Sequence, residues 1–165
     1  MLSRFRTLLL LLALNVCAEV TRAQLPPSDP VTCNANPNFR FSVSGNTTMV
    51  LSNLTDFLNP QSISFSIDVE SNNNSYKVYI AGVVTGVSGA ESTLIPLNSF
   101  TVSASNSGGT QIPAITLNEN YQVVVAAGKA KSRTHQITLT RAPLSTFTQA
   151  PGTHTVLLHI RICQD

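Results

Sequence analysis

Histidines are the residues of this sequence best suited to bind a metal ion. A zinc or copper site needs three or four converging ligands. His154 and His159 lie in one alternating stretch with opposite parity, so they cannot face the same ion without distortion. His135 is the third histidine, and no H-x-H or His-x-x-Cys spacing occurs. We therefore expect no metal site.

Asp68 and Glu70 are the carboxylates most suggestive of catalysis, because residues two apart in a strand share a face. Such a pair could serve in glycoside hydrolysis or bind Ca²⁺. The pair stands directly before the Asn-rich stretch 71–75, where charged residues commonly mark the solvent end of a strand. We expect both to be solvated, unless the fold brings Asp56 or Glu119 beside them.

Nucleophile and nucleotide-binding motifs do not occur in the sequence. Gly86-Val87-Ser88-Gly89 differs from G-x-S-x-G, and neither a P-loop nor a Rossmann glycine pattern is present. We expect no catalytic residues, no cofactor and no enzymatic activity.

Lys129, Lys131 and Arg133 alternate with small residues, and His135 continues the series. In an extended chain they form a ridge with its charge on one side. The ridge could bind a partner chain or an acidic glycan. It could equally be a solvated hairpin tip that discourages edge-to-edge aggregation.

Residues 1–23 have the layout of a secretory signal: a basic start, an apolar run and small residues at Thr21-Arg22-Ala23. We expect cleavage after Ala23, with Ala18 as the second choice. A lipoprotein anchor at Cys17 is disfavoured because bulky Val16 precedes it. The protein should be secreted, to the periplasm or the cell surface, with no membrane association after cleavage.

Removal of this segment takes away Arg4, Arg6, Arg22 and Glu19. The formal net charge falls from +2 to zero, because seven basic and seven acidic side chains remain. Nucleic acids usually require a concentrated basic surface, so we expect no nucleic-acid partner.

Cys33 and Cys163 are the two cysteines that remain, one at each end of the exported chain. Thiols pair by default in an oxidising compartment, so we predict a Cys33–Cys163 disulfide between the first and last strands. Residues 24–32 contain three prolines and are predicted to form an extended arm. Residues 33–165 are predicted to form one domain.

Period-two alternation dominates that domain. Residues 61–70 alternate most cleanly, and residues 76–84 follow the polar stretch 71–75, which predicts a β-hairpin. Residues 128–134 are predicted to form a turn or hairpin tip. Further strands are expected near residues 39–43, 94–105, 112–117, 121–127, 136–141 and 155–163, and residues 49–51 are a short apolar run. We predict an all-β fold, an immunoglobulin-like or jelly-roll β-sandwich of about eight strands, with strand order unsettled.

The C-terminal end, Pro151-Gly152-Thr153-His154-Thr155 and then an alternating strand to Cys163, resembles bacterial pilin-like secreted domains of the spore coat protein U and chaperone–usher type. Cys33 and the stretch Phe65–Asn74 add to the resemblance. It implies surface fibres built by strand complementation, with an extended N-terminal arm as donor. Here the arm has only Leu25 and Val31 as large apolar residues, which leaves a self-contained domain open.

We therefore expect an exported, non-enzymatic structural or adhesive protein of the bacterial surface, such as a pilus or coat subunit. Its partners would be other protein subunits, a periplasmic chaperone or a glycan. The alternative is a carbohydrate- or other ligand-binding module, which would need an exposed aromatic platform. The chain has no Trp, and Tyr76, Tyr79 and Tyr121 all fall within predicted strands.

Overall fold

The computed structural model describes residues 39–49, 54–88, 95–105, 109–110, 112–143 and 153–165, and these confirm the predicted all-β class. The elements are β1 (Arg40–Gly45), the short helix α1 (Leu54–Leu58), β2 (Gln61–Ser88), the 3-10 turn η1 (Leu97–Ser99), β3 (Phe100–Ser105), β4 (Gly109–Thr110), β5 (Ile115–Thr116), β6 (Gln122–Arg141) and β7 (Thr153–Gln164).

Two long antiparallel strands, β2 and β6, form the centre of a single seven-stranded sheet. They pair from Gln61 opposite Arg141 to Ile80 opposite Gln122. The order of the sheet is β1-β2-β6-β3-β5, while β7 pairs with β2 and β4 pairs with β6. Every strand pair described is antiparallel.

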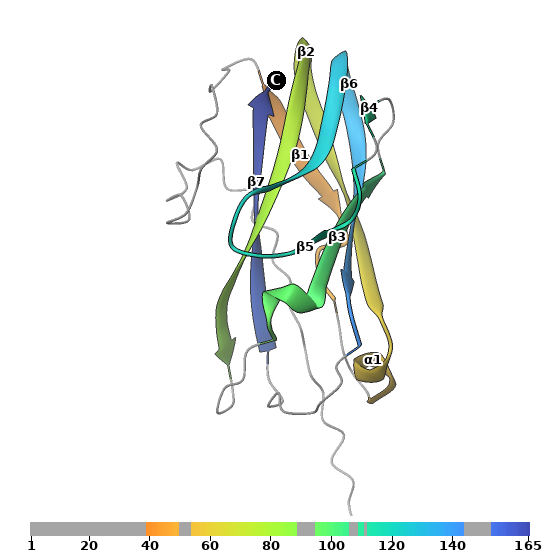
Figure 1. Cartoon of the computed structure of the whole chain (residues 1–165), viewed down its shortest axis with the longest axis vertical. Helices are drawn as coiled ribbons and strands as arrows, with labels where there is room; N and C mark the ends of the chain where they lie inside the picture. Colours follow the sequence, from red (N-terminus) through yellow and green to blue (C-terminus); the bar gives the residue numbers. More distant parts are fainter. Residues whose placement is uncertain (1–38, 50–53, 89–94, 106–108, 111, 144–152) are drawn as a thin grey trace, which may run out of the picture.

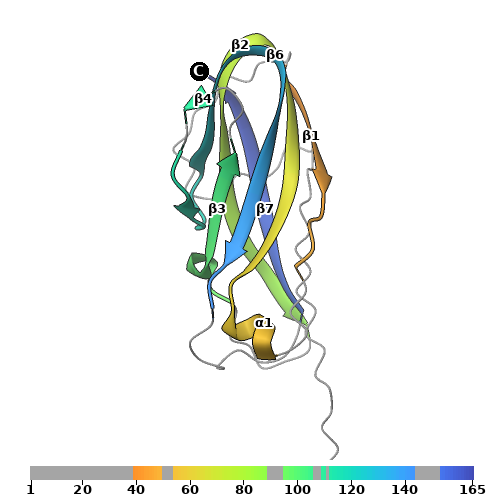
Figure 2. The ribbon, with the colours of Figure 1, turned by 90° about the vertical axis from the view of Figure 1, so that its right-hand side faces the viewer.

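The sheet folds over itself because β2 and β6 bend together. Residues 61–70 of β2 lie between β1 and residues 132–141 of β6, and β3 lies beyond. Residues 76–88 lie beside β7, and their first part also pairs with residues 122–127 of β6. Figure 2 shows both strands arching at the top of the molecule (compare Figure 1). The halves below the arch form a first layer (β1, β2, β6, β3, β5) and a second layer (β7, β2, β6, β4).

The predicted hairpin between residues 61–70 and 76–84 is therefore wrong. Both stretches belong to the one strand β2, and each pairs with a different half of β6. Asn72 and Asn73 have φ of 47° and 66°, the left-handed region that Asn tolerates better than most residues. The β2–β6 register shifts between Glu70 and Tyr76. The polar stretch thus supplies a bulge that bends a paired ribbon, rather than a turn that reverses the chain.

Side-chain hydrogen bonds hold this bend. Ser71 is fully buried and its Oγ donates to the carbonyl oxygen of Ala130 at 2.6 Å. Asn74 Nδ2 donates to the carbonyl oxygen of Ser71 at 2.9 Å. These contacts give two backbone carbonyls hydrogen-bond donors at a point where a bulge disrupts the ladder.

The predicted turn at residues 128–134 is also wrong, because β6 runs without interruption from Gln122 to Arg141. It crosses from the second layer to the first beside the bend in β2. Four of the expected strands therefore form the two long strands β2 and β6. The described residues form seven strands, where about eight were expected.

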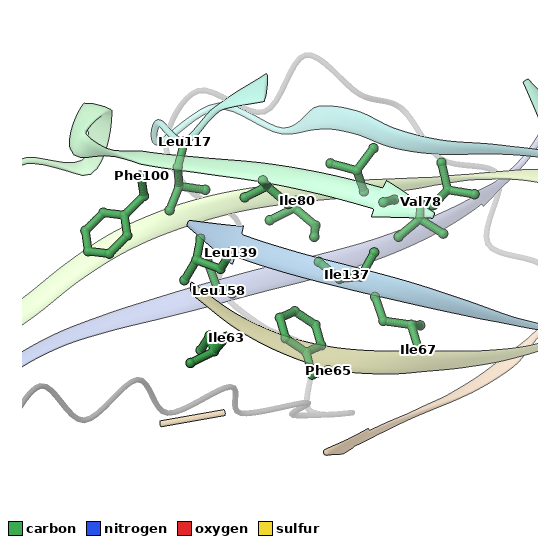
Figure 3. Packing of buried hydrophobic residues seen from close by; sticks show 14 of the residues in the cluster. Ile63, Phe65, Ile67, Val78, Ile80, Phe100, Leu117, Ile137, Leu139 and Leu158 are labelled. Carbon is green, nitrogen blue, oxygen red and sulfur yellow. The ribbon is translucent and has the colours of Figure 1, made fainter. Parts of the chain in front are cut away.

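The core lies between the two layers, and period-two alternation correctly predicts its side chains. Ile63, Phe65, Ile67 and Val69 are buried, and the serines between them face outward. Figure 3 shows Ile63, Phe65 and Ile67 on the side of the core opposite Val78 and Ile80 of the second layer. The other buried apolar residues include Tyr76, Phe100, Val102, Leu117, Val125, Ile137, Leu139, Val156 and Leu158.

Gly82 packs closely against Leu117, and its N–H donates to the carbonyl oxygen of Asn118 at 2.8 Å. A Cβ at position 82 would lie 2.7 Å from Leu117 Cγ. We expect Gly82→Ala to lower the free energy of unfolding by about 1–3 kcal/mol, the usual cost of overpacking. Urea unfolding of Gly82→Ala, Leu117→Ala and the double variant checks this. Strictly additive losses in the double variant would contradict a steric cause.

Several predictions lie outside the described residues. These are the signal segment 1–23, the arm 24–32, residues 33–38 with Cys33, and the part of the apolar run 49–51 beyond Met49.

Candidate functional site: the bend of the sheet and the two outer faces

The apex, defined as residues 71–75 of β2 and 128–133 of β6, carries the predicted basic ridge. Lys129 and Lys131 are exposed, whereas Arg133 is half-buried and its Nη2 donates to the carbonyl oxygen of Lys129 at 3.5 Å. His135 is fully buried, so it is not part of the exposed ridge. The exposed part of the ridge is therefore a pair of lysines at one end of the molecule, on a strand paired with β2.

Beneath the apex, a hydrogen bond joins the two layers. Tyr76 lies in the second-layer half of β2, and His135 lies in the first-layer half of β6. The Tyr76 hydroxyl and His135 Nε2 are 2.6 Å apart, and both residues are fully buried. Phe39 packs edge-on against the Tyr76 ring with centroids 6.0 Å apart. This contact fixes the distance between the layers just below the bend.

Burial controls the protonation of this pair. It raises the pKa of Tyr76 to about 12, an effect that the positive charge of Arg133 partly offsets. Burial, and then repulsion from Arg133, lowers the pKa of His135 below its ordinary value of 6.5. Both groups are therefore neutral around pH 7. His135 Nδ1 is buried without a hydrogen-bond partner, so a protonated ring would have a donor that nothing accepts.

We expect acid to destabilise the fold through His135. His135 of the unfolded chain binds a proton near pH 6.5, whereas His135 of the folded chain binds it only at lower pH. The contribution of His135 to the free energy of unfolding is therefore fully present above pH 6.5 and is lost as pH falls below it. The contribution of Tyr76 to the free energy of unfolding is present below pH 10 and is lost as pH rises toward 12. Urea unfolding across this range measures both, and a His135→Gln variant is the control. Parallel profiles for the variant and the natural chain below pH 6.5 would contradict the role of His135.

Arg141 is a second buried polar residue, at the opposite end of the first layer. Its Nη2 donates to the carbonyl oxygens of Asp56 at 2.6 Å and Asn59 at 3.2 Å, and Nη1 donates to that of Ala142 at 2.9 Å. Its Cζ lies 6.0 Å from the Phe57 ring centroid. A cation at the C-terminus of α1 satisfies carbonyls that lack intrahelical partners. Arg141 thus anchors α1 to β6.

The outer face of the first layer, named here the hydroxyl face, is polar and its side chains pair across strands. Ser62 and Ser64 of β2 lie 2.8 and 2.9 Å from the hydroxyls of Thr140 and Thr138 of β6. Asp68 belongs to this face and accepts a hydrogen bond from the Thr134 hydroxyl at 2.5 Å. These contacts are cross-strand pairs that stabilise a sheet. Asp68 therefore serves the sheet, and Glu70, farther along the same face, is exposed.

The outer face of the second layer, named here the tyrosine face, has a different composition. Arg161 of β7 stands opposite Tyr79 of β2, which stands opposite Val123 of β6. In the next row His159 stands opposite Ala81. The guanidinium of Arg161 lies over the Tyr121 ring, with Cζ 5.0 Å from its centroid, a cation–π contact. Aromatic, aliphatic and cationic groups thus gather where the first layer has hydroxyls.

Cys163 is 5 % exposed on this face. Its expected partner, Cys33, lies outside the described residues, so the Cys33–Cys163 pairing stays a prediction. Within the residues the structure describes, no three His, Cys, Asp or Glu side chains come together in a way that could hold a metal ion.

Sequence reasoning missed the roles of Tyr76, His135 and Arg141, although one signal pointed to two of them. His135 and Arg141 have the same parity as the buried Ile137 and Leu139. Period-two alternation therefore places both on the inward face, where a polar side chain needs a partner. Tyr76 had the parity of Val78 and Ile80, which are likewise buried.

Comparison of the chain with models of protein families, with curated proteins and with solved structures finds no match in any of the three. In the described part of the chain no helix is long and apolar enough to cross a membrane.

Proposed function

We propose that this chain is an exported, non-enzymatic structural or adhesive protein of the bacterial surface, comparable to a pilus or coat subunit. Residues 1–23 would direct export to the periplasm or cell surface. A Cys33–Cys163 disulfide would join the chain ends, and the burial of Cys163 near the end of β7 supports it.

The observation that carries the proposal is the use of the polar side chains. His135 bonds to Tyr76 between the layers, and Arg141 binds the carbonyls of α1. The hydroxyls of the first layer pair with one another across strands. These polar side chains therefore hold parts of the sheet together, which suits a structural role.

The edges of the sheet support assembly with other subunits. Among the described residues, β1 and the twelve-residue β7 each pair with β2 alone. Edge strands are the surfaces to which another chain adds a strand. Other protein subunits or a periplasmic chaperone are accordingly the partners of this proposal.

Deletion of the gene is the first experiment. We expect the deletion strain to lose a surface fibre or coat component, and the purified exported chain to bind a chaperone or to oligomerise. A chain that stays monomeric and binds no chaperone, together with an unchanged cell surface, would refute the proposal.

The lysine pair at the apex provides a sharper test of partner binding. We expect Lys129→Glu with Lys131→Glu to weaken binding to the partner recovered in the first experiment by at least about tenfold, because a charge reversal opposes an acidic partner surface. The matched control is Lys129→Arg with Lys131→Arg, which keeps the charge. Stability should stay within about 0.5 kcal/mol for both pairs, as for surface substitutions generally. Equal affinity of the Glu and Arg variants would exclude the apex from the contact.

A further inference from the structure

The apex is the least regular part of the paired ribbon. The β2–β6 register shifts twice between Glu70 and Tyr76, and residues 71–73 of β2 stand opposite Lys131 alone. Segments in which the strand ladder is interrupted open locally at a lower free energy than a continuously paired core. The apex is therefore the part of the sheet best suited to open while the layers below it stay paired.

One side chain at this place can gain a charge near neutral pH. His135 is fully buried, and its Nε2 lies 2.6 Å from the Tyr76 hydroxyl of the other layer. Phe39 of β1 packs against the same tyrosine ring. Among the described residues, Nδ1 of His135 has no hydrogen-bond partner. A protonated imidazole carries a hydrogen on both nitrogens, so it would bury a cationic donor that nothing accepts.

The groups that face His135 also oppose its protonation. Arg133 of β6 has the same parity and acts on the ring as a second cation, while β2 faces it with the neutral hydroxyl of Tyr76. Asp68 and Glu70, the carboxylates of the adjoining half of β2, belong to the outward hydroxyl face. A positive charge on His135 would therefore have a like charge beside it and no carboxylate on its own side of the sheet.

The remaining charges near the apex do not compensate. Lys129 and Lys131 are exposed cations of the same strand. Lys77 and Asp165 form an ion pair with each other on the tyrosine face. Protonated His135 would thus be the fourth cation among the seven residues 129–135. Repulsion within this row favours an apex in which the strands have moved apart and water surrounds the charges.

Opening the apex changes the proton affinity of His135. A solvated histidine binds a proton near pH 6.5, whereas burial and Arg133 hold the pKa of His135 lower in the closed apex. The closed form is therefore fully favoured above pH 6.5, and the open form gains population as pH falls below it. Each pH unit below 6.5 multiplies the population of the open form by up to about tenfold.

We propose that the apex is an acid-sensitive switch. Protonation of His135 favours separation of its ring from Tyr76 and opens residues 71–76 and 128–135, while the rest of the two layers stays paired. The open form exposes the Tyr76 ring and moves the lysine pair away from the bend of β2. A partner bound at the apex is then held more weakly in acid; this consequence rests on the proposed function, whereas the opening itself does not.

Hydrogen exchange of the isolated full chain, followed by mass spectrometry, tests the switch. We correct the rates for the pH dependence of the exchange chemistry. Peptides from residues 71–76 and 128–135 should then exchange about tenfold faster at about pH 5.5 than at about pH 7.5, because this is the gain in the open form that a histidine of pKa 6.5 provides. Peptides from residues 61–65 and 137–141 should keep their protection.

His135→Gln is the decisive variant, because the amide stays neutral and can still form a hydrogen bond with the Tyr76 hydroxyl. Its apex should exchange at a rate that does not depend on pH after correction. The matched control is His159→Gln, a half-buried histidine of the tyrosine face, which should keep the acid response of the natural chain. Equal acceleration by acid in the natural chain and in His135→Gln would overturn the proposal.

A second comparison needs no variant. If acid accelerated exchange in residues 61–65 and 137–141 as much as at the apex of the natural chain, the whole fold would be opening, and a local switch would be ruled out. Unchanged exchange at the apex between the two pH values would overturn it equally. Because no partner takes part in the measurement, its failure is distinguishable from failure of the proposed function.

Discussion

Replacing Tyr76 with alanine should lower the free energy of unfolding by about 3–5 kcal/mol, the range for large buried aromatic residues. The ring is fully buried in contact with Phe39 and His135. Its hydroxyl bonds to His135 Nε2 at 2.6 Å across the two layers. Alanine would leave a cavity at the bend and a buried imidazole with no partner for Nε2. Chemical unfolding at pH 7 measures the loss.

Tyr76→Phe separates the ring from the hydroxyl. It keeps the packing and removes one buried hydrogen bond, so we expect a loss of about 1–2 kcal/mol. Tyr79→Phe is the matched control three residues along the same strand, where the half-buried side chain faces outward. It should change stability by less than about 0.5 kcal/mol. If Tyr76→Phe were as stable as the control, the hydrogen bond between the layers would contribute nothing.

Replacing Arg141 with alanine should lower the free energy of unfolding by about 3 kcal/mol. Carbonyl oxygens of α1 and of Ala142 would lose a charged donor, and each such hydrogen bond contributes about 1.5–3 kcal/mol. The cost is moderated because the guanidinium itself is desolvated in the fold, which lowers its pKa. Hydrogen exchange should also show α1 opening more often in this variant, since Arg141 anchors it to β6.

Two controls distinguish this anchoring from a general effect of charge. Arg141→Lys keeps the cation but lacks the planar fork that reaches several carbonyls at once, so we expect about half of the loss. Arg40→Ala removes an exposed arginine of β1 and should change stability by less than about 0.5 kcal/mol. A loss for Arg40→Ala equal to that of Arg141→Ala would contradict the anchoring role.

The Tyr76 predictions concern the bend of the sheet, where partner binding is proposed, and the Arg141 predictions concern the opposite end of the first layer. Tyr76 and His135 lie under the apex that presents Lys129 and Lys131. Loosening this contact should therefore alter partner binding at the apex, even though neither residue is exposed. A partner assay with Tyr76→Phe is informative for that reason.

Residue parity was readable in the sequence because a strand places successive side chains on opposite faces, wherever the strand lies. Ile63, Phe65 and Ile67 are buried, and Ser62 and Ser64 face solvent, as their alternation predicts. The all-β class follows from the same local rule. Arg141 has the inward parity as well, whereas His135 was expected on the outward basic ridge and is buried in the structure.

Strand pairing was decided only by the tertiary structure. The stretch 71–75 has the Ser and Asn composition of a turn. Such residues occur both where the chain reverses direction and where a strand contains a bulge. Which of the two occurs is decided by β6, because β6 pairs with both halves of β2 and continues without interruption beside the bend. That pairing joins residues at least 42 positions apart, from Ile80 opposite Gln122 to Gln61 opposite Arg141, and no local pattern encodes it.

The same long-range pairing created the features from which function is inferred. It set Tyr76 against His135, turned Lys129 and Lys131 to the end of the molecule, and gave the two outer faces different compositions. The amino-acid sequence determined which side chains share a face of each strand, because alternation depends on each strand alone. The tertiary structure decided which of them meet, because that depends on how one long ribbon folds over.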